Sequence, residues 1–87
     1  MKAKIYITYK EGILDPEGTT VNKALDSMGI KNIESLDIGK YIQMKFGNIS
    51  KNEAEKLCEE ACSKLLANHN TETYYYEILE NEWNLVL

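Results

Sequence analysis

The order in which two hydrophobic periodicities follow each other along this chain restricts the folds open to it. Residues 2–10 alternate with a period of two, which predicts a β-strand with one apolar face. That face carries Ala3, Ile5, Ile7 and Tyr9. Residues 16–28 then follow a helical period, and the apolar stripe of this helix is expected to face a sheet. The stripe consists of Val21, Ala24, Leu25 and Met28.

The two ends of this first helix carry their own signals. Asp15 is a favourable N-cap residue, and Pro16 suits the first helical position because its missing N–H would be unpaired there in any case. Gly29 is placed to adopt the left-handed conformation just past the last turn. The sequence therefore predicts a helix that begins at Pro16 and ends before Gly29.

Two further strands are expected at residues 33–38 and 41–46, joined as a hairpin at Gly39 and Lys40. The register of this hairpin stays open. A two-residue loop would place Asp37 on the same face as Ile42 and Met44, whereas a three-residue loop or a bulge near Gly39 would restore the match of apolar faces.

A capping box opens the second helix. The Ser50 hydroxyl and the Glu53 carboxylate can each satisfy a backbone amide of the other. The apolar stripe of this helix is Ala54, Leu57, Cys58, Ala61, Cys62 and Leu65. Residues 68–70 close the helix, and residues 73–80 alternate again as a fourth strand. One face of this strand carries Tyr74, Tyr76 and Ile78, and the other carries Thr73, Tyr75, Glu77 and Leu79.

The resulting order, β-α-β-β-α-β, is the split βαβ pattern of ferredoxin-like α+β folds. It predicts a single domain over residues 1–87, with a four-stranded antiparallel sheet and two helices on one face. The other face is left open, and in a third arrangement of the hairpin Leu36 and Ile38 lie on it and make it partly apolar. An apolar tail follows the last strand at residues 81–87 and contains Trp83.

Charge and composition exclude several classes of protein. Lys and Arg total 10 against 14 Asp and Glu, a net charge of −4, so the field of the chain repels phosphate backbones and nucleic acid is not an expected partner. No apolar run reaches the roughly 18 to 20 residues of a membrane span, and no signal-peptide core follows Met1. A cytoplasmic location without membrane contact is therefore expected. Cys58 and Cys62 share one apolar stripe, which favours reduced thiols packed in the core.

The chain has few residues suited to catalysis. His69 is the only histidine, and no serine or cysteine motif places a nucleophile beside it. The glycines match neither of the common phosphate-binding loops, and acidic residues before the first helix oppose a phosphate there. Cys58 and Cys62 lack a second pair of ligands for a metal. No catalytic, cofactor-binding or metal-ligating residue is predicted.

One pattern indicates a different function. Residues 39–46 loosely resemble the aromatic RNA-binding segment of RRM domains, which share this element order. Tyr6, Tyr41 and Tyr75 would then lie together on the open face as stacking platforms. A tyrosine-rich face is at least as often a protein interface. A single-stranded RNA-binding module and an ACT-like small-molecule regulatory domain stay as alternatives to an assembly subunit.

The segment from Lys10 to Gly18, KEGILDPEG, resembles a specific family: PurS, the small subunit of phosphoribosylformylglycinamidine (FGAM) synthase in bacteria and archaea. The family has a similar strand exit followed by a DPxG motif. Supporting similarities are Ala24-Leu25 with Gly29, Gly39-Lys40-Tyr41-Ile42, Cys58, and Leu65-Leu66-Ala67-Asn68. Two departures are His69, where the family commonly has proline, and the tail beyond the usual end of the family.

The resemblance implies a subunit without an active site of its own, within an ATP- and glutamine-dependent ligase of de novo purine biosynthesis. In this family a glutaminase subunit releases ammonia and a large synthetase subunit binds ATP and magnesium. The small subunit, as a dimer or higher homo-oligomer, bridges the two and supports ammonia transfer. The loop residues expected to contact these partners are Lys10, Gly12, Asp15, Pro16, Gly18, Gly39 and Lys40. The expected self-association face consists of Tyr6, Leu36, Ile38, Tyr41, Tyr75 and Trp83.

Overall fold

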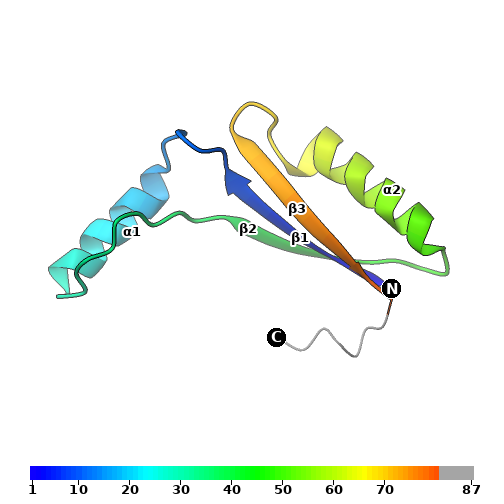
Figure 1. The fold of residues 1–87 in the computed structure, drawn as a ribbon, viewed down its shortest axis with the longest axis horizontal. Coiled ribbons are helices and arrows are strands. Elements are labelled where there is room, and N and C mark those ends of the chain that lie inside the picture. The colour runs from blue at the N-terminus through cyan, green and yellow to red at the C-terminus, as the bar shows by residue number, and fades with distance from the viewer. Residues whose placement is uncertain (81–87) are drawn as a thin grey trace.

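A computed structural model of the chain describes residues 1–80 and contains one antiparallel sheet of three strands in the order β2-β1-β3 (Figure 1). The elements along the chain are β1 (Lys2–Tyr9), α1 (Pro16–Ser27), β2 (Lys40–Lys45), α2 (Lys51–Ala61), the π-helical turn η1 (Cys62–Leu66) and β3 (Glu72–Leu79). The first strand of the sequence thus becomes the central strand of the sheet.

The prediction of a strand at residues 33–38 is wrong, and with it the four-stranded sheet and the hairpin at Gly39 and Lys40. Within residues 1–80 this segment pairs with no strand. The Ile38 N–H, which a strand partner would need, donates instead to the Asp15 carboxylate at 2.7 Å. The chain then joins β1 directly at Lys40, and a Cβ on Gly39 would lie 2.5 Å from the Ile7 carbonyl oxygen. Close approach of two backbones, and not a turn, requires glycine here.

The first helix is also displaced from its predicted place. We call residues 10–39 the α1 arm: it leaves β1, contains α1 and returns to β2, and Figure 1 shows α1 lying beyond the end of the sheet. The stripe predicted to face the sheet is open to solvent, with Met28 73% and Val21 36% exposed. The expectation of two helices on one face of the sheet is therefore wrong. The predicted ends of the helix are confirmed, because Pro16 is its first residue and Gly29 has a φ of +88°.

The arm gives the described part of the chain an elongated shape. The principal extents of the structure are 49, 31 and 14 Å, and its radius of gyration is 16.3 Å. A compact domain of this length would have a radius of gyration of about 12 Å. The excess shows that α1 does not contribute to the core beneath α2.

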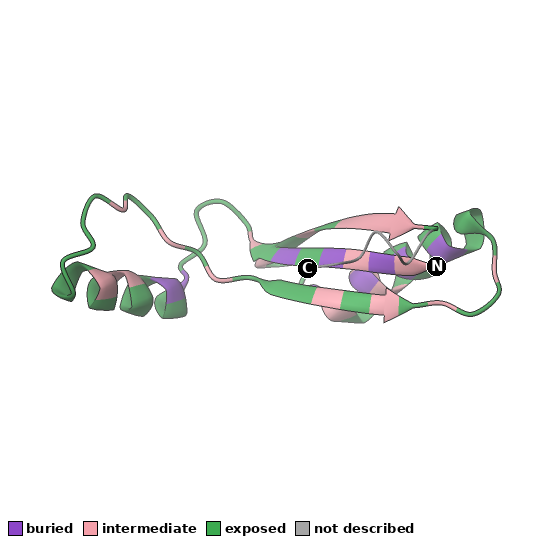
Figure 2. Ribbon diagram, turned by 90° about the horizontal axis from the view of Figure 1, so that it is seen from below, coloured by how far each residue is buried: buried purple, intermediate pink, exposed green. Residues whose placement is uncertain are grey.

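The core lies between the sheet and α2. The side chains that form it are Ala3, Ile5, Ile7, Cys58, Cys62 and Ala67. Figure 2 shows the alternation of buried and exposed residues along β1, as the sequence predicts. Ser50 caps α2 by accepting the Glu53 N–H at 3.2 Å, which confirms that half of the capping box. Both cysteines are free and buried, which confirms their predicted place in the core.

The α2 helix covers only part of the helix side of the sheet. Its Glu59 carboxylate accepts a hydrogen bond from the Tyr74 hydroxyl of β3 at 2.6 Å, which fixes the β3 side of the helix. Leu57 lies on the opposite flank of α2, since Cys58 separates it from Glu59 on the helical turn. Leu57 and Leu65 are 48% and 82% exposed, so this part of the predicted stripe is not buried. The half of the sheet formed by β2 has no helix over it among the described residues (Figure 1).

Candidate functional site

The residues predicted to contact partners lie in two groups, one inside the α1 arm and one at its base. Inside the arm, the Asp15 side chain is buried and accepts two backbone hydrogen bonds. Oδ1 accepts the Gly18 N–H at 2.9 Å, and Oδ2 accepts the Ile38 N–H at 2.7 Å. These two bonds lower the pKa of Asp15, so the carboxylate is ionised at neutral pH. Asp15 therefore ties the start of α1 to the segment that returns from it.

Gly18 is required by the same arrangement. A Cβ at this position would lie 2.2 Å from the carbonyl oxygen of Leu36 and 2.5 Å from Asp15 Oδ2. Its φ is not positive, whereas Gly12 has a φ of +84° and supplies the turn after β1. The DPEG segment, Asp15 to Gly18, thus holds the arm together internally.

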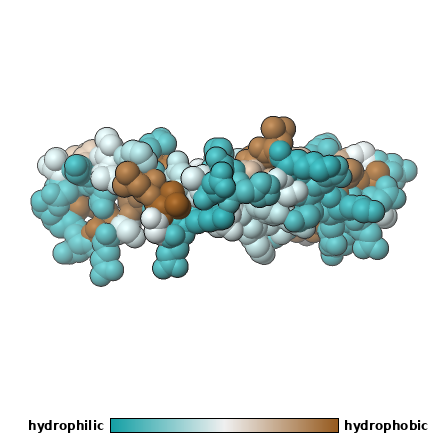
Figure 3. All heavy atoms as spheres, turned by 90° about the horizontal axis from the view of Figure 1, so that it is seen from above, coloured by the Kyte–Doolittle hydropathy of each residue, from teal (hydrophilic) through white to brown (hydrophobic). Residues whose placement is uncertain are grey.

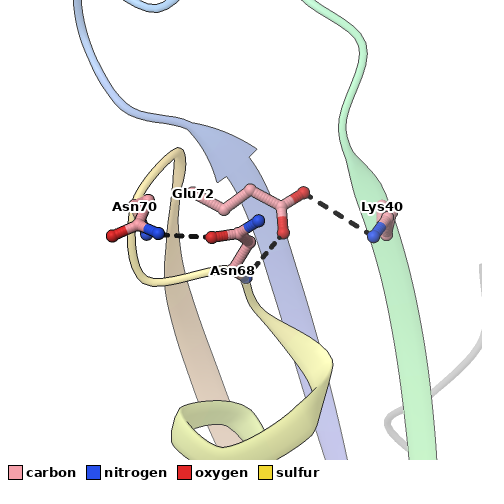
Figure 4. A network of polar contacts seen from close by, with 4 residues as sticks. All are labelled: Lys40, Asn68, Asn70 and Glu72. Atoms are coloured by element: carbon pink, nitrogen blue, oxygen red, sulfur yellow. Dashed lines mark hydrogen bonds and ion pairs between the residues drawn. The ribbon is translucent and has the colours of Figure 1, made fainter.

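The base of the arm carries a polar network (Figure 4). Glu72, at the start of β3, has a side chain only 13% exposed and lies 3.6 Å from the Lys40 ammonium. Its Oε1 also accepts the Asn68 N–H at 2.8 Å. Asn68 in turn accepts the Asn70 N–H through Oδ1 at 2.9 Å. One partly buried carboxylate therefore joins β2 to the loop between η1 and β3.

Lys10 ties the other end of the arm to the same loop. Its ammonium donates to the backbone carbonyl of His69, and its backbone N–H donates to Thr71 at 2.8 Å. Lys10 and Lys40, which the sequence placed in separate loops, thus both anchor the arm on residues 68–72. Sequence reasoning missed Glu72. The signal that could have found it is a carboxylate that closely follows two asparagines in a turn, because side chains of turn residues commonly bind backbone amides.

The open face of the sheet brings three of the predicted self-association residues together. Tyr6 pairs with Tyr41 on one side and Tyr75 on the other. The ring centroids lie 5.2 and 6.0 Å apart, and both pairs are stacked. We call Tyr41, Tyr6 and Tyr75 the tyrosine row. Leu36 and Ile38 lie in the arm and not on this face, and Trp83 lies outside the described residues.

The cysteines offer no reactive group. Burial raises the pKa of Cys58 to about 12, and burial also raises the pKa of Cys62. Both thiols are therefore protonated at neutral pH and are poor nucleophiles. Across residues 1–80, no three His, Cys, Asp or Glu side chains gather as metal ligands. The same part of the chain holds no helix with the length and apolar character of a membrane span.

Comparison with known families gives this geometry its context. The family model PurS, described as phosphoribosylformylglycinamidine (FGAM) synthase, matches residues 2–80. The chain belongs to the PurS family. It is therefore a small subunit of FGAM synthase in purine biosynthesis, as the resemblance implied. The match ends where the tail begins.

Curated PurS subunits and solved PurS structures agree with this assignment. The chain is 40% identical to the PurS subunit of Bacillus subtilis over 79 residues, which cover 91% of this chain and 93% of that subunit. It is 39% identical to the PurS subunit of Archaeoglobus fulgidus over 74 residues, 85% and 92% of the two chains. The solved Bacillus subtilis PurS structure superposes with a TM-score of 0.81, at 40% identity, over 91% of this chain and 98% of that one.

A PurS chain from a multisubunit structure is also similar. The structure of PurLQS from Thermotoga maritima contains a chain that superposes with a TM-score of 0.80, at 28% identity. The match covers 90% of this chain and 95% of that one. Such coverage includes most of the α1 arm, since the arm spans residues 10–39. The likeness to that chain therefore takes in most of the arm.

Proposed function

We propose that this chain is a non-catalytic assembly subunit, which bridges the glutaminase and synthetase subunits of FGAM synthase and supports the transfer of ammonia between them. The observation that carries this proposal is the likeness, arm included, to a chain of the PurLQS structure. In this proposal ATP and magnesium bind to the synthetase subunit, and no cofactor or metal binds here. The proposed location is the cytoplasm.

The proposal includes self-association through the α1 arm. The stripe of α1 is exposed, most of all at Met28, and so is the flank of α2 that carries Leu57 and Leu65. Figure 3 shows apolar atoms at the surface over both parts of the molecule. The half of the sheet beside that flank carries Ile42 and Met44, which are only partly buried, and no helix of residues 1–80 covers it.

A second copy supplies a helix of matching chemistry. If each copy places its α1 beside the α2 of the other, both apolar surfaces are covered by one two-fold operation. The exchange restores the two-helix layer that the element order predicted, with the helices coming from different chains. A domain of this size gains much from such burial, because its own core is small.

Activity of the reconstituted synthase tests the bridging role. The large synthetase and glutaminase subunits are assayed with and without this chain, once with glutamine and once with ammonia as nitrogen donor. We expect glutamine-dependent turnover to require the chain and ammonia-dependent turnover to be nearly independent of it. If the chain changes neither rate, the bridging role is wrong, and single-stranded RNA binding at the tyrosine row is the next function to measure.

A further inference from the structure

The outer edge of the sheet at β2 continues beyond the strand itself. β2 is an edge strand, and the segment before it runs on from the start of β2 towards α1 (Figure 1). The odd-numbered residues from 35 to 43 are all exposed, whereas Leu36, Ile38 and Ile42 are half-buried, an alternation typical of a strand. We call residues 35–43 the β2 edge. It is centred on Gly39 and has a strand-like pattern on both sides of that glycine.

Three contacts show which way the backbone groups of this segment point. The Phe46 N–H donates to the Met1 carbonyl at 2.9 Å, so the even-numbered residues of β2 face β1. The Ile38 N–H donates to the N-cap carboxylate of α1 at 2.7 Å, and the Leu36 carbonyl oxygen lies 2.2 Å from the place of a Cβ on Gly18. Successive residues of a strand point their backbone groups to opposite edges. The odd-numbered residues of the β2 edge therefore point theirs outward.

These outward groups have no partner within the described part of the chain. Across residues 1–80, the backbone N–H and C=O groups of Ser35, Asp37 and Gly39 make no hydrogen bond. No strand of the same residues lies on the outer side of Tyr41 and Gln43, because β2 ends the sheet. An unpaired edge of this kind is a template for another strand. The β2 edge is therefore an interaction surface.

We propose that the β2 edges of two copies pair antiparallel about a two-fold axis at Gly39. In this register Asp37 of each copy lies opposite Tyr41 of the other, and Ser35 lies opposite Gln43. All four residues are odd-numbered, so their outward N–H and C=O groups bond each other. The inference rests on the self-association part of the proposed function and gives that association a defined axis.

The side chains favour this register over its neighbours. With the axis at Gly39, Leu36 lies opposite Ile42, and both belong to the half-buried side of the segment. An axis at Lys40 would set two ammonium groups directly opposite each other, which is unfavourable. An axis at Ile38 would set Leu36 opposite Lys40. The axis at Gly39 alone pairs the two apolar residues and opposes no like charges.

The pairing agrees with the exchange of α1 arms. It brings the arm of one copy alongside β2 of the other, at the half of the sheet that no helix of residues 1–80 covers. One two-fold operation thus serves both contacts. The Asp15 carboxylate prepares the segment for pairing, because it holds the Ile38 N–H on the inner side and leaves the outer side free. A strand that is already in place loses less entropy when it binds.

Disulfide trapping of the purified chain tests the pairing. The double variant Ser35→Cys, Gln43→Cys sets thiols of different copies opposite each other, with Cα atoms about 5.5 Å apart, a distance that a disulfide spans. Within one chain these positions are eight residues apart, about 26 Å in a strand. Ser35→Cys with Tyr41→Cys is the matched control, because an offset of two residues puts the Cα atoms about 7 to 8 Å apart.

With oxidised glutathione as the oxidant, we expect the covalent dimer of the Ser35→Cys, Gln43→Cys variant to form at least tenfold faster than that of the control. Both native cysteines are buried, so they do not compete. Faster trapping of the control would move the axis to Ile38 and overturn the register. A chain that sediments as a dimer but traps neither variant overturns the edge pairing and leaves the exchange of α1 arms standing. A chain that stays monomeric overturns both, whereas failure of the bridging role shows only in the glutamine-dependent rate.

Hydrogen exchange of the unsubstituted chain gives a second measurement. The Tyr41 and Gln43 amides point to the outer edge, whereas the Ile42 amide points to β1. We expect protection of the two outer amides to rise at least tenfold as the chain associates with increasing concentration, while Ile42 stays protected throughout. Outer amides that exchange at the same rate in the dilute and the associated chain contradict the pairing.

Discussion

The Asp15 carboxylate accepts the Ile38 N–H at 2.7 Å across 23 residues of sequence. This bond closes the α1 arm on itself near the point where the arm meets the sheet. Because Asp15 also caps α1 through Gly18, one side chain fixes both the start of the helix and the path of the segment that returns from it.

The ionisation of Asp15 should therefore control the order of the arm. Its pKa is lowered from the ordinary 3.8 by the Gly18 and Ile38 amides, so the stabilisation is complete above about pH 4 and is lost as pH falls through the lowered value. Hydrogen exchange of the Ile38 amide is the measurement. In Asp15→Ala the exchange rate at neutral pH should rise roughly tenfold, the effect of losing a charge-assisted bond. Equal protection of the Ile38 amide in both proteins would mean that Asp15 does not hold the arm closed.

Gly18→Ala should destabilise the fold by about 1 to 3 kcal/mol or more, because the new methyl group has no space. Its Cβ would meet the Leu36 carbonyl oxygen at 2.2 Å. Gly47→Ala is the control, since a Cβ there meets nothing within 4 Å. Urea denaturation of both variants gives the comparison. If Gly18→Ala loses no more stability than Gly47→Ala, the arm rearranges around the new methyl group at no cost in free energy.

Glu72→Ala should cost more stability than Lys40→Ala. The Glu72 carboxylate is 13% exposed and also accepts the Asn68 N–H, so its loss removes a charge-assisted hydrogen bond as well as the ion pair, at about 1.5 kcal/mol. The Lys40 side chain is 62% exposed, so its ion pair is screened and contributes less than about 1 kcal/mol. Thermal unfolding measures both. The reverse order would show that the ion pair, and not the loop amide, holds the base of the arm.

Met28→Asp should dissociate the self-associated chain, because it places a charge at the most exposed residue of the apolar stripe, which a second copy covers in our proposal. We expect sedimentation velocity to show a shift towards monomer of at least tenfold in dissociation constant. Lys23→Asp, on the opposite side of α1, is the control and should change the dissociation constant by much less. A Met28→Asp protein that remains fully associated assigns the interface to another surface.

Local signals in the sequence predicted the elements well where one residue type has one clear role. Pro16 and Gly29 bound α1 as expected, and the alternation of β1 and β3 gives the correct faces of both strands. The predicted tyrosine cluster followed directly from that alternation, because pairing in register brings Tyr6 beside Tyr41 and Tyr75.

The errors arose where an apolar pattern does not show which surface or strand it packs against. The apolar stripe of α1 has the same spacing whether the helix packs on its own sheet or on another surface. The sequence therefore could not predict where the arm lies. Residues 33–38 have a strand-like pattern, but the carboxylate of Asp15 takes the Ile38 amide and a contact 23 residues apart is invisible to local reasoning. The role of Glu72 was missed for the same reason, since its partner Lys40 lies far away in sequence.

The order of strands in the sheet has a consequence for synthesis of the chain. The central strand β1 is made first, and both of its neighbours, β2 and β3, are made after the whole arm and after α2 respectively. A nascent chain therefore carries Ile5 and Ile7 without any sheet partner until Lys45 has been made, and with only one of the two neighbouring strands until Leu79 has been made. Folding that depends on such distant contacts is slow. Until β2 and β3 have paired with it, β1 is an exposed strand at which chaperones bind or aggregation begins.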